Sequence, residues 1–221
     1  GWLQRLISIP AEPRPVPQIG WLGVTAVATW IGYAAANWRI ALLALGTFVS
    51  YGALGYWSDS MDLLIIVGIS VLVCVVVGLP LGVLAGTSRR ANAVIEPLLD
   101  LLQTMPTFVY LLPIVLFFGI GAASAVVATV LYAAPPLIRI AAHGIRSVPV
   151  AMLEVGQSLG QTRRQRLLGV QIPLAKRTII VGLNQTTMAA LSMATIASFV
   201  DGPGLGKPVL AGLRINDVGT A

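Results

Sequence analysis

Long uncharged intervals divide this sequence into segments that could cross a membrane. These intervals are residues 15–38, 40–58, 63–88, 101–138 and 178–200. A membrane-spanning helix needs about 20 apolar residues, so four of the intervals fit one span each. The remaining interval, 101–138, would be about 57 Å long as a single helix, whereas a bilayer core is about 30 Å thick. It must therefore fold back on itself.

The fold-back is predicted where small residues interrupt this interval. Gly119-Ile120-Gly121 is followed by Ala122-Ala123-Ser124, a sequence typical of a turn. Dividing the interval there predicts six spans in all. The predicted fold class is an all-α integral membrane protein, a polytopic helical bundle. Proline is expected to kink or break the fourth span at Pro106 and Pro113 and the fifth at Pro135-Pro136.

The composition agrees with a lipid environment and excludes several other classes. Hydrophobic residues make up 57% of the 221 residues and charged residues 10%, with a mean hydropathy of +0.87; soluble domains carry about 25% charged residues. The single cysteine, Cys74, and the single histidine, His143, exclude a disulfide framework and a zinc site. The net charge is +6, but the basic residues are not interleaved with aromatic residues as they are on a nucleic-acid-binding surface. We therefore expect no bound metal and no nucleic-acid partner.

The basic residues predict the orientation in the membrane. If the segment between Arg139 and Arg177 is cytoplasmic, ten of the 14 Lys and Arg residues lie inside and four outside. This asymmetry satisfies the positive-inside rule and predicts a multi-pass protein of the cell (inner) membrane. Both ends of the sequence then lie outside the cytoplasm.

The two ends of the sequence carry separate expectations. Residues 1–14 are predicted to be an extracytoplasmic or interfacial segment, with Trp2, Leu3, Leu6 and Ile7 on one helical face, although a frayed terminus explains so short a stretch equally well. Residues 15–221 form the predicted transmembrane domain. Because residues 201–221 contain no span, a further C-terminal span is expected to follow in the intact protein.

The predicted cytoplasmic loop, about residues 141–177, is long and patterned. A helix-like stretch begins at Pro149 and ends near Gly160, and the basic run 163–166 follows before Pro173 leads back to the membrane. A solvated loop that serves only the charge rule is the simpler interpretation. The spacing of the residues in this loop favours a second interpretation.

That spacing resembles the EAA loop of binding-protein-dependent ABC importers. Glu154 is followed by Gly160 six residues later and then by the apolar pair and proline at 170–173, while Val155 and Gly156 replace the two alanines of the motif. In that family the loop is the coupling helix, which sits in a groove of the ATPase subunit. The resemblance implies that the ATPase-coupling residues are Glu154, Gly156, Gly160, Arg163, Arg164 and Pro173.

Three further segments, 97–121, 134–139 and 182–198, resemble the permease subunits of glycine betaine/proline betaine importers of the ProW and OpuA type. The resemblance implies the type I ABC importer permease fold, a second permease copy, two cytoplasmic ATPase subunits and an extracytoplasmic substrate-binding protein. It also implies that this chain binds no cofactor and catalyses no reaction, ATP and Mg belonging to the ATPase. Consistently, Asp201–Pro208 fails the phosphate-loop pattern, since Asp201 and Pro208 replace its first Gly and its Ser/Thr.

Candidate pathway residues come from the spans that carry these segments. A quaternary ammonium solute favours aromatic faces, and a pathway needs kinks and polar positions. The candidate pathway or gate residues are Met105, Pro106, Phe108, Tyr110, Tyr132, Asn184, Thr187 and Met188. For the aromatic and polar residues, helix packing or anchoring at the membrane interface is an equally open explanation.

Several alternative functions remain at this stage. A choline or carnitine permease, or a permease for another small solute, would share the same loop. A passive osmotic channel or a membrane scaffold would have no need of it. An intramembrane enzyme is disfavoured, because the predicted spans contain no cluster of carboxylate, His or Cys side chains.

Overall fold

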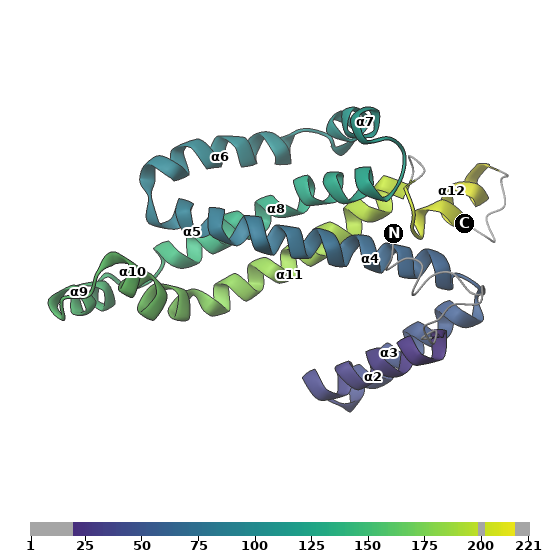
Figure 1. Ribbon diagram of the computed structural model, residues 1–221, viewed down its shortest axis with the longest axis horizontal. Coiled ribbons are helices and arrows are strands. Elements are labelled where there is room, and N and C mark those ends of the chain that lie inside the picture. The colour runs from purple at the N-terminus through teal and green to yellow at the C-terminus, as the bar shows by residue number, and fades with distance from the viewer. Residues whose placement is uncertain (1–19, 199–201, 215–221) are drawn as a thin grey trace, which may run out of the picture. The chain divides into compact units, whose positions relative to one another are not determined.

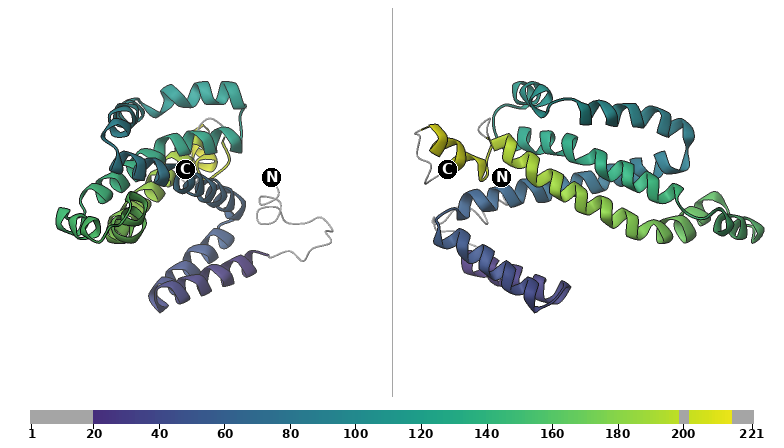
Figure 2. Two further views of the ribbon diagram at one scale, coloured as in Figure 1. Left: turned by 60° about the vertical axis from the view of Figure 1, so that its left-hand side comes forward. Right: turned by 180° about the vertical axis from the view of Figure 1, so that it is seen from behind.

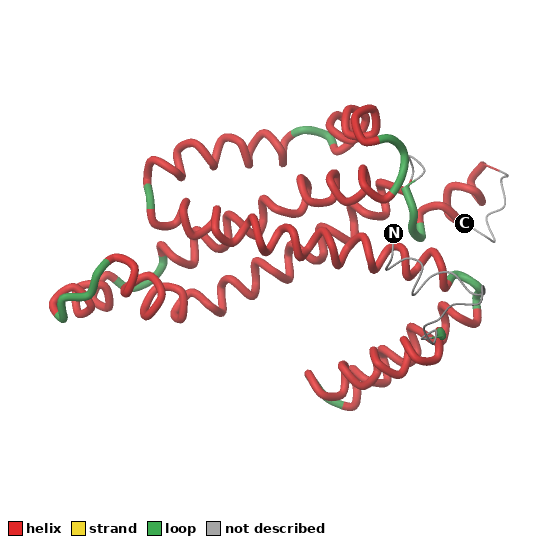
Figure 3. The backbone as a smooth tube through the Cα atoms, in the orientation of Figure 1, coloured by secondary structure: helices red, strands yellow, loops and turns green. Residues whose placement is uncertain are grey.

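A computed structural model describes residues 20–198 and 202–214 of the chain, with the side chain of Arg214 excepted. All regular structure in these ranges is helical (Figure 3). The chain forms two compact units: residues up to Ile66 with those from Thr195 onward, and Val67–Ala194. The predicted N-terminal segment, 1–14, lies outside the described residues.

The first unit contains a helical hairpin of α2 (Trp21–Ala35) and α3 (Trp38–Ala53). The hairpin turns where the Asn37 side chain accepts a hydrogen bond of 3.2 Å from the Ile40 N–H and so caps α3. Trp21 contacts Trp57 edge-on, with ring centroids 6.4 Å apart. The turn between α2 and α3 lies just before Arg39, which is the boundary between the first two predicted spans.

The same unit contains α12 (Gly206–Arg214), which follows a Gly-rich turn. A Cβ atom at Gly206 would lie 2.6 Å from both the Cβ of Ser198 and the carbonyl oxygen of Thr195. Distances this short exclude any side chain at position 206. The glycines of this segment thus allow α12 to begin against the end of the preceding helix.

Three long helical runs are apolar and long enough to cross a membrane among the described residues. The first, Trp57–Thr87, joins α4 (Trp57–Val73), the π-helical turn η1 (Cys74–Gly78) and α5 (Leu79–Thr87). The second is α8 (Ala122–Arg146). The third, Arg163–Ala197, joins α10 (Arg163–Arg166), η2 (Leu167–Gln171) and α11 (Ile172–Ala197).

Glycines bring α5 and α8 of the second unit into close contact. Gly78, Gly82 and Gly86 recur every fourth residue and therefore share one face of the helix. A Cβ atom at Gly82 would lie 2.7 Å from the Cβ of Ala141 and 2.9 Å from the carbonyl oxygen of Ile138. Small residues in this spacing let two membrane helices approach until their backbones touch. The core of the unit forms along this contact.

The fourth predicted span is broken at Pro106, as the sequence predicted. α6 (Arg89–Thr104) and α7 (Thr107–Phe118) meet at 96° across Met105-Pro106. Pro106 has no N–H to continue the helical ladder, and it restricts Met105 to the extended conformation that is observed. The two helices would count as one span only if the bent pair crosses the membrane together.

The predicted elements therefore match the structure unevenly. The turn at Gly119–Gly121 is confirmed, since both glycines have positive φ (76° and 146°). The described residues hold three helical runs of spanning length, or four with the bent pair, together with the shorter apolar helices α2 and α3. The six predicted spans correspond to these three runs, the bent pair and the two shorter helices, and α2 and α3 are shorter than a typical span. Pro113 and Pro135-Pro136 lie inside α7 and α8 without ending them, so of the two effects predicted there, a kink or a break, the break does not occur.

Candidate functional site

The predicted coupling loop is a short helix-turn-helix at one end of the second unit. α9 (Val150–Ser158) is followed by a turn and by α10, and both project beyond the ends of α8 and α11 (Figures 1 and 2). α8 continues to Arg146 and the next helical run begins at Arg163, so the flanking helices extend into the range 141–177. The part of that range outside the long helices is 147–162.

Gly160 makes the reversal between the two short helices. Its φ is +74°, a left-handed conformation that glycine adopts without steric cost. The Gly160 N–H donates to the carbonyl of Gln157 and the Gln161 N–H to that of Gly156, each at 3.0 Å. These two bonds close the end of α9. The chain therefore reverses at Gly160, where the sequence predicted the end of the helix-like stretch.

Gly156 and Thr162 hold the two helices against each other. A Cβ atom at Gly156 would lie 2.7 Å from the Oε1 of Gln161 and 3.2 Å from the Cγ of Arg166. Thr162 caps α10 in a reciprocal capping box with Gln165. The Arg166 guanidinium also donates to the side-chain oxygen of Gln157 at 3.1 Å. The turn is therefore an ordered element rather than a loose loop.

The outer surface of α9 combines apolar side chains with one carboxylate. Glu154 is exposed. The exposed large apolar residues around it are Val150, Met152, Val155 and Leu159, the last with 74% of its surface accessible. A nine-residue helix that exposes such side chains outside the long spans has the composition of an interface that a partner covers. Arg163, Arg164 and Pro173 are exposed as well.

The candidate gate residues around the break occupy two environments. Met105 is half-buried and Pro106 exposed at the bend itself, and Phe108 is exposed on α7. Tyr110 is buried on α7, which packs against α8, the helix that carries Tyr132, and no described residue bonds the Tyr110 hydroxyl. Among these candidates, Tyr110 is therefore part of the packed interior, whereas Phe108 stays exposed.

The candidates on α11 lie on and beside an exposed face. Asn184 and Met188 are one helical turn apart and both exposed. Thr187 is half-buried and donates its hydroxyl to the carbonyl of Leu183 at 3.0 Å. Thr187 therefore satisfies its hydroxyl within the helix. Asn184 is exposed, so its amide is accessible at the surface of α11.

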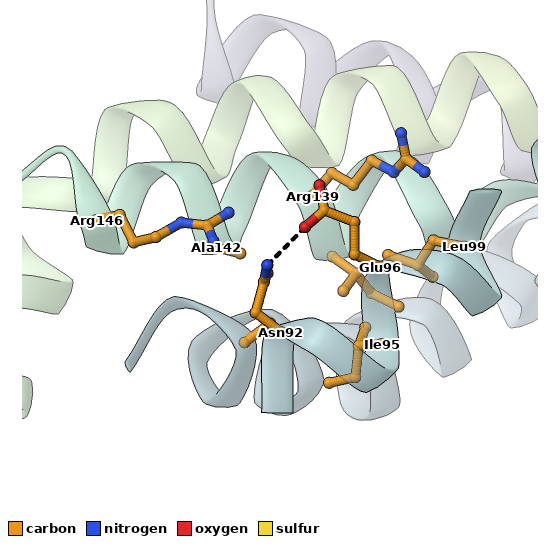
Figure 4. Close-up of a pocket in the computed structure, with 9 residues that line it drawn as sticks. Asn92, Ile95, Glu96, Leu99, Arg139, Ala142 and Arg146 are labelled. Atoms are coloured by element: carbon orange, nitrogen blue, oxygen red, sulfur yellow. Dashed lines mark hydrogen bonds between the residues drawn. The ribbon is translucent and has the colours of Figure 1, made fainter. Parts of the chain in front are cut away.

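A cavity of about 210 Å³ between α5, α6 and α8 holds polar residues that sequence reasoning did not select. Asn92 and Glu96 point from α6 toward α8, and Arg146 reaches from α8 toward them (Figure 4). The Asn92 amide donates to the Glu96 carboxylate. The Asn-x-x-x-Glu spacing, which places both side chains on one helical face, was the available signal. The cavity offers charges of both signs to a small polar molecule.

Arg139, which also lines this cavity, forms an ion pair with Asp100 between α8 and α6. Both side chains are more than one third exposed, so solvent screens the pair and it stabilises the fold by less than about 1 kcal/mol. Asp100→Asn is expected to lower the midpoint of thermal unfolding by no more than about 4 °C. A fluorescence-based thermal shift of the purified protein measures this. A drop well above that range would show that the pair is structurally essential.

Comparison with known proteins decides the family. The profile of the binding-protein-dependent transport system inner membrane component matches residues 78–221, more than half of the chain. The chain belongs to this family. The match covers α5 to α12, including the glycine contact, the broken helix pair and the helix-turn-helix. The chain is thus an inner membrane component of a transport system, as the charge pattern and the loop predicted.

Relatives of this transport component include permeases named for betaine transport. The chain is 45% identical over 90% of its length to the glycine betaine/proline betaine transport system permease protein ProW of Escherichia coli, of which it covers 58%. It is 45% identical over 83% of its length to the glycine betaine transport system permease protein OpuAB of Bacillus subtilis, of which it covers 64%. The chain therefore spans about three fifths of these relatives.

The transport component also resembles a solved structure. An inward-facing conformation of the MetNI methionine ABC transporter superposes with a TM-score of 0.64 over 72% of this chain and 79% of that one. The sequences are 20% identical, so the likeness concerns the fold. It confirms the predicted type I importer permease fold.

Proposed function

We propose that this chain is the transmembrane subunit of an ATP-driven importer for glycine betaine, proline betaine or a related quaternary ammonium solute. The observation that carries the proposal is the ordered turn between α9 and α10. It projects from the second unit and exposes Glu154 among apolar side chains. The betaine assignment is supported by relatives named for that solute.

The proposed mechanism assigns this chain a mechanical role. The exposed face of α9 docks on a cytoplasmic ATPase subunit, which holds ATP and Mg and performs hydrolysis. Because α8 and α11 flank the loop, movement of the docked loop is transmitted to both helices. The solute passes along the surface of α11 and the α6–α7 bend, where Met105, Pro106, Asn184 and Met188 are candidate lining residues. A second permease copy completes the pathway, and an extracytoplasmic binding protein delivers the solute.

Related solutes form the nearest alternative. One relative, GbuB of Listeria monocytogenes, is named for glycine betaine and carnitine transport, and another, TmoV of Ruegeria pomeroyi, for trimethylamine N-oxide transport; each is 40% identical to this chain. All of these solutes carry a fully substituted nitrogen. Competition for uptake between labelled glycine betaine and each unlabelled solute separates the candidates.

The decisive experiment is uptake by the complete transporter in proteoliposomes. The permease is purified with its ATPase and reconstituted, the binding protein is added outside with labelled glycine betaine, and ATP is enclosed. We expect accumulation that requires both ATP and the binding protein. Equal fluxes without ATP would identify a passive channel and refute the proposal, whereas ATP-driven uptake of a different solute would correct the substrate alone.

Reversing the charge of Glu154 is expected to reduce ATP-driven uptake about tenfold or more. Glu154→Lys places a cation on the docking face, where it would repel a basic partner group and leave that group unpaired. Glu154→Gln, which removes the charge without reversing it, is expected to cause a smaller loss. Uptake and ATPase activity of the same proteoliposomes provide the measurement. Equal uptake by wild type and Glu154→Lys would contradict docking through this face.

A further inference from the structure

A second cavity, of about 690 Å³, lies behind the coupling loop and is strongly basic. It is bounded by the end of α5, the end of α8, the inner side of α9, and α10 with η2. The arginines that line it come from two separate segments: Arg146 from α8, and Arg163, Arg164 and Arg166 from α10. None of the described residues that line this cavity is acidic.

No carboxylate of a described residue lines this second cavity, although Arg146 also lines the first cavity together with Glu96. Among the described residues, the ion pair is the one between Arg139 and Asp100. None of the four arginines that line the second cavity takes part in an ion pair with another described residue. Arg166 donates to the neutral side chain of Gln157. Four like charges around one cavity repel each other, and an anion placed among them removes that repulsion. The cavity therefore favours a negatively charged ligand.

The donor set favours a phosphate group among anions. A guanidinium presents a planar fork of N–H groups that matches two oxygens of one phosphate. Ser88 also lines the cavity, and its hydroxyl oxygen accepts from the Ala91 N–H at 3.3 Å, which leaves the hydroxyl hydrogen available to a ligand oxygen. Gln171 adds an amide to the lining. A tetrahedral anion can accept from several of these donors at once.

The position of the cavity points to the membrane surface. All three helical runs of spanning length in the described part of the chain have one end at this cavity: Trp57–Thr87 at Thr87, Ala122–Arg146 at Arg146, and Arg163–Ala197 at Arg163. The ends of spanning helices lie at the level of lipid headgroups. The volume also exceeds that of a bare phosphate ion and leaves room for the remainder of a headgroup. A phospholipid phosphate is therefore the first source to test, ahead of a soluble phosphate.

We propose that the cavity lined by Arg146 and the α10 arginines is an anion site that takes a phosphate group, and that the bound group ties the coupling loop to the ends of α5 and α8. The site goes beyond the proposed transport function. Its test is a binding measurement, so failure of the site and failure of the transport proposal are distinguishable.

The binding test uses native mass spectrometry of the purified transporter complex, titrated with phosphatidylglycerol or with zwitterionic phosphatidylcholine. We expect preferential binding of phosphatidylglycerol, weakened about tenfold in Arg146→Gln/Arg164→Gln. The control, Lys176→Gln/Arg177→Gln, removes two exposed charges of α11 that do not line the cavity, and it should bind as wild type does. The single variant Arg164→Gln replaces the double variant if the latter fails to fold, since Arg164 is exposed on α10.

A second arm identifies the source of the phosphate. Thermal unfolding is followed in sodium phosphate and in sodium chloride of equal ionic strength. Stabilisation by phosphate in wild type but not in the double variant, with unchanged phosphatidylglycerol binding, would support the site and assign it a soluble phosphate ligand. If neither ligand distinguishes the double variant from wild type, the proposal is overturned. Loss of the ATPase from the complex without any change in ligand binding would also overturn it, and would assign the arginines to the ATPase interface.

Discussion

Replacing Gly82 with leucine is expected to prevent accumulation of folded permease. A Cβ atom alone at this position would lie 2.9 Å from the carbonyl oxygen of Ile138 and 2.7 Å from the Cβ of Ala141. The obstacle includes backbone, which cannot rotate away, so α5 and α8 would have to separate. Overpacking costs about 1–3 kcal/mol, and more where no side chain can yield. The amount of monodisperse protein after detergent extraction measures the effect.

Gly68→Leu is the matched control for this prediction. Gly68 lies in the same helical run and is exposed, and a Cβ atom at this position would meet no other atom within 4 Å. Leucine there would extend into lipid and should leave the yield of folded protein unchanged. If both variants fold equally well, the contact between α5 and α8 is not the tight one described. If neither variant yields folded protein, the helical run itself does not tolerate leucine in place of glycine, and the result does not report on the contact between α5 and α8.

Replacing Gly160 with valine is expected to reduce ATP-driven uptake about tenfold or more while the permease remains folded in the membrane. The cause is backbone conformation, because a Cβ atom at Gly160 would meet nothing within 4 Å. The φ of +74°, however, is a conformation that β-branched residues almost never adopt. The reversal between α9 and α10 would open and displace the docking face. Uptake and ATPase rates in proteoliposomes, together with the amount of reconstituted permease, provide the measurement.

Two controls separate this effect from a general loss of stability. Gly169→Val changes a nearby glycine in η2 that is also surrounded by open space but lacks a positive φ, and it should transport normally. Gly160→Asn should retain more uptake than Gly160→Val, since asparagine tolerates the left-handed region. Full activity of Gly160→Val would show that the reversal is not needed for coupling.

Much of the candidate site could be predicted because the residues that indicate it are close together in the sequence. Glu154, Gly160 and Pro173 lie in one stretch of sequence, and a left-handed turn at glycine depends on neighbouring residues alone. The glycine contact of α5 had a local signal too, the recurrence of Gly78, Gly82 and Gly86 every fourth residue. That spacing predicts a close helix contact but does not name its partner, α8. The roles of the coupling and pathway residues remain predictions.

The sequence could not predict which of the four prolines in the fourth and fifth spans breaks its helix. The interval 101–138 is uncharged throughout, yet the helix turns by 96° at Met105-Pro106 and not at Pro113 or at Pro135-Pro136. Every proline removes the same backbone donor. Which proline ends a helix depends on whether surrounding segments satisfy the freed carbonyls and accept the bend. That information is spread over several helices.

By itself, the sequence determined that this protein is an α-helical membrane protein, where most of its apolar segments lie, and which stretch forms the ordered loop. Charge exclusion from lipid and the conformational limits of Gly and Pro act along the chain, so they can be read from it. The tertiary structure alone decided which helices touch and which charges converge. Arg146 and Arg164 meet at one cavity although they belong to different helices, because α8 and the coupling loop return the chain to the same place.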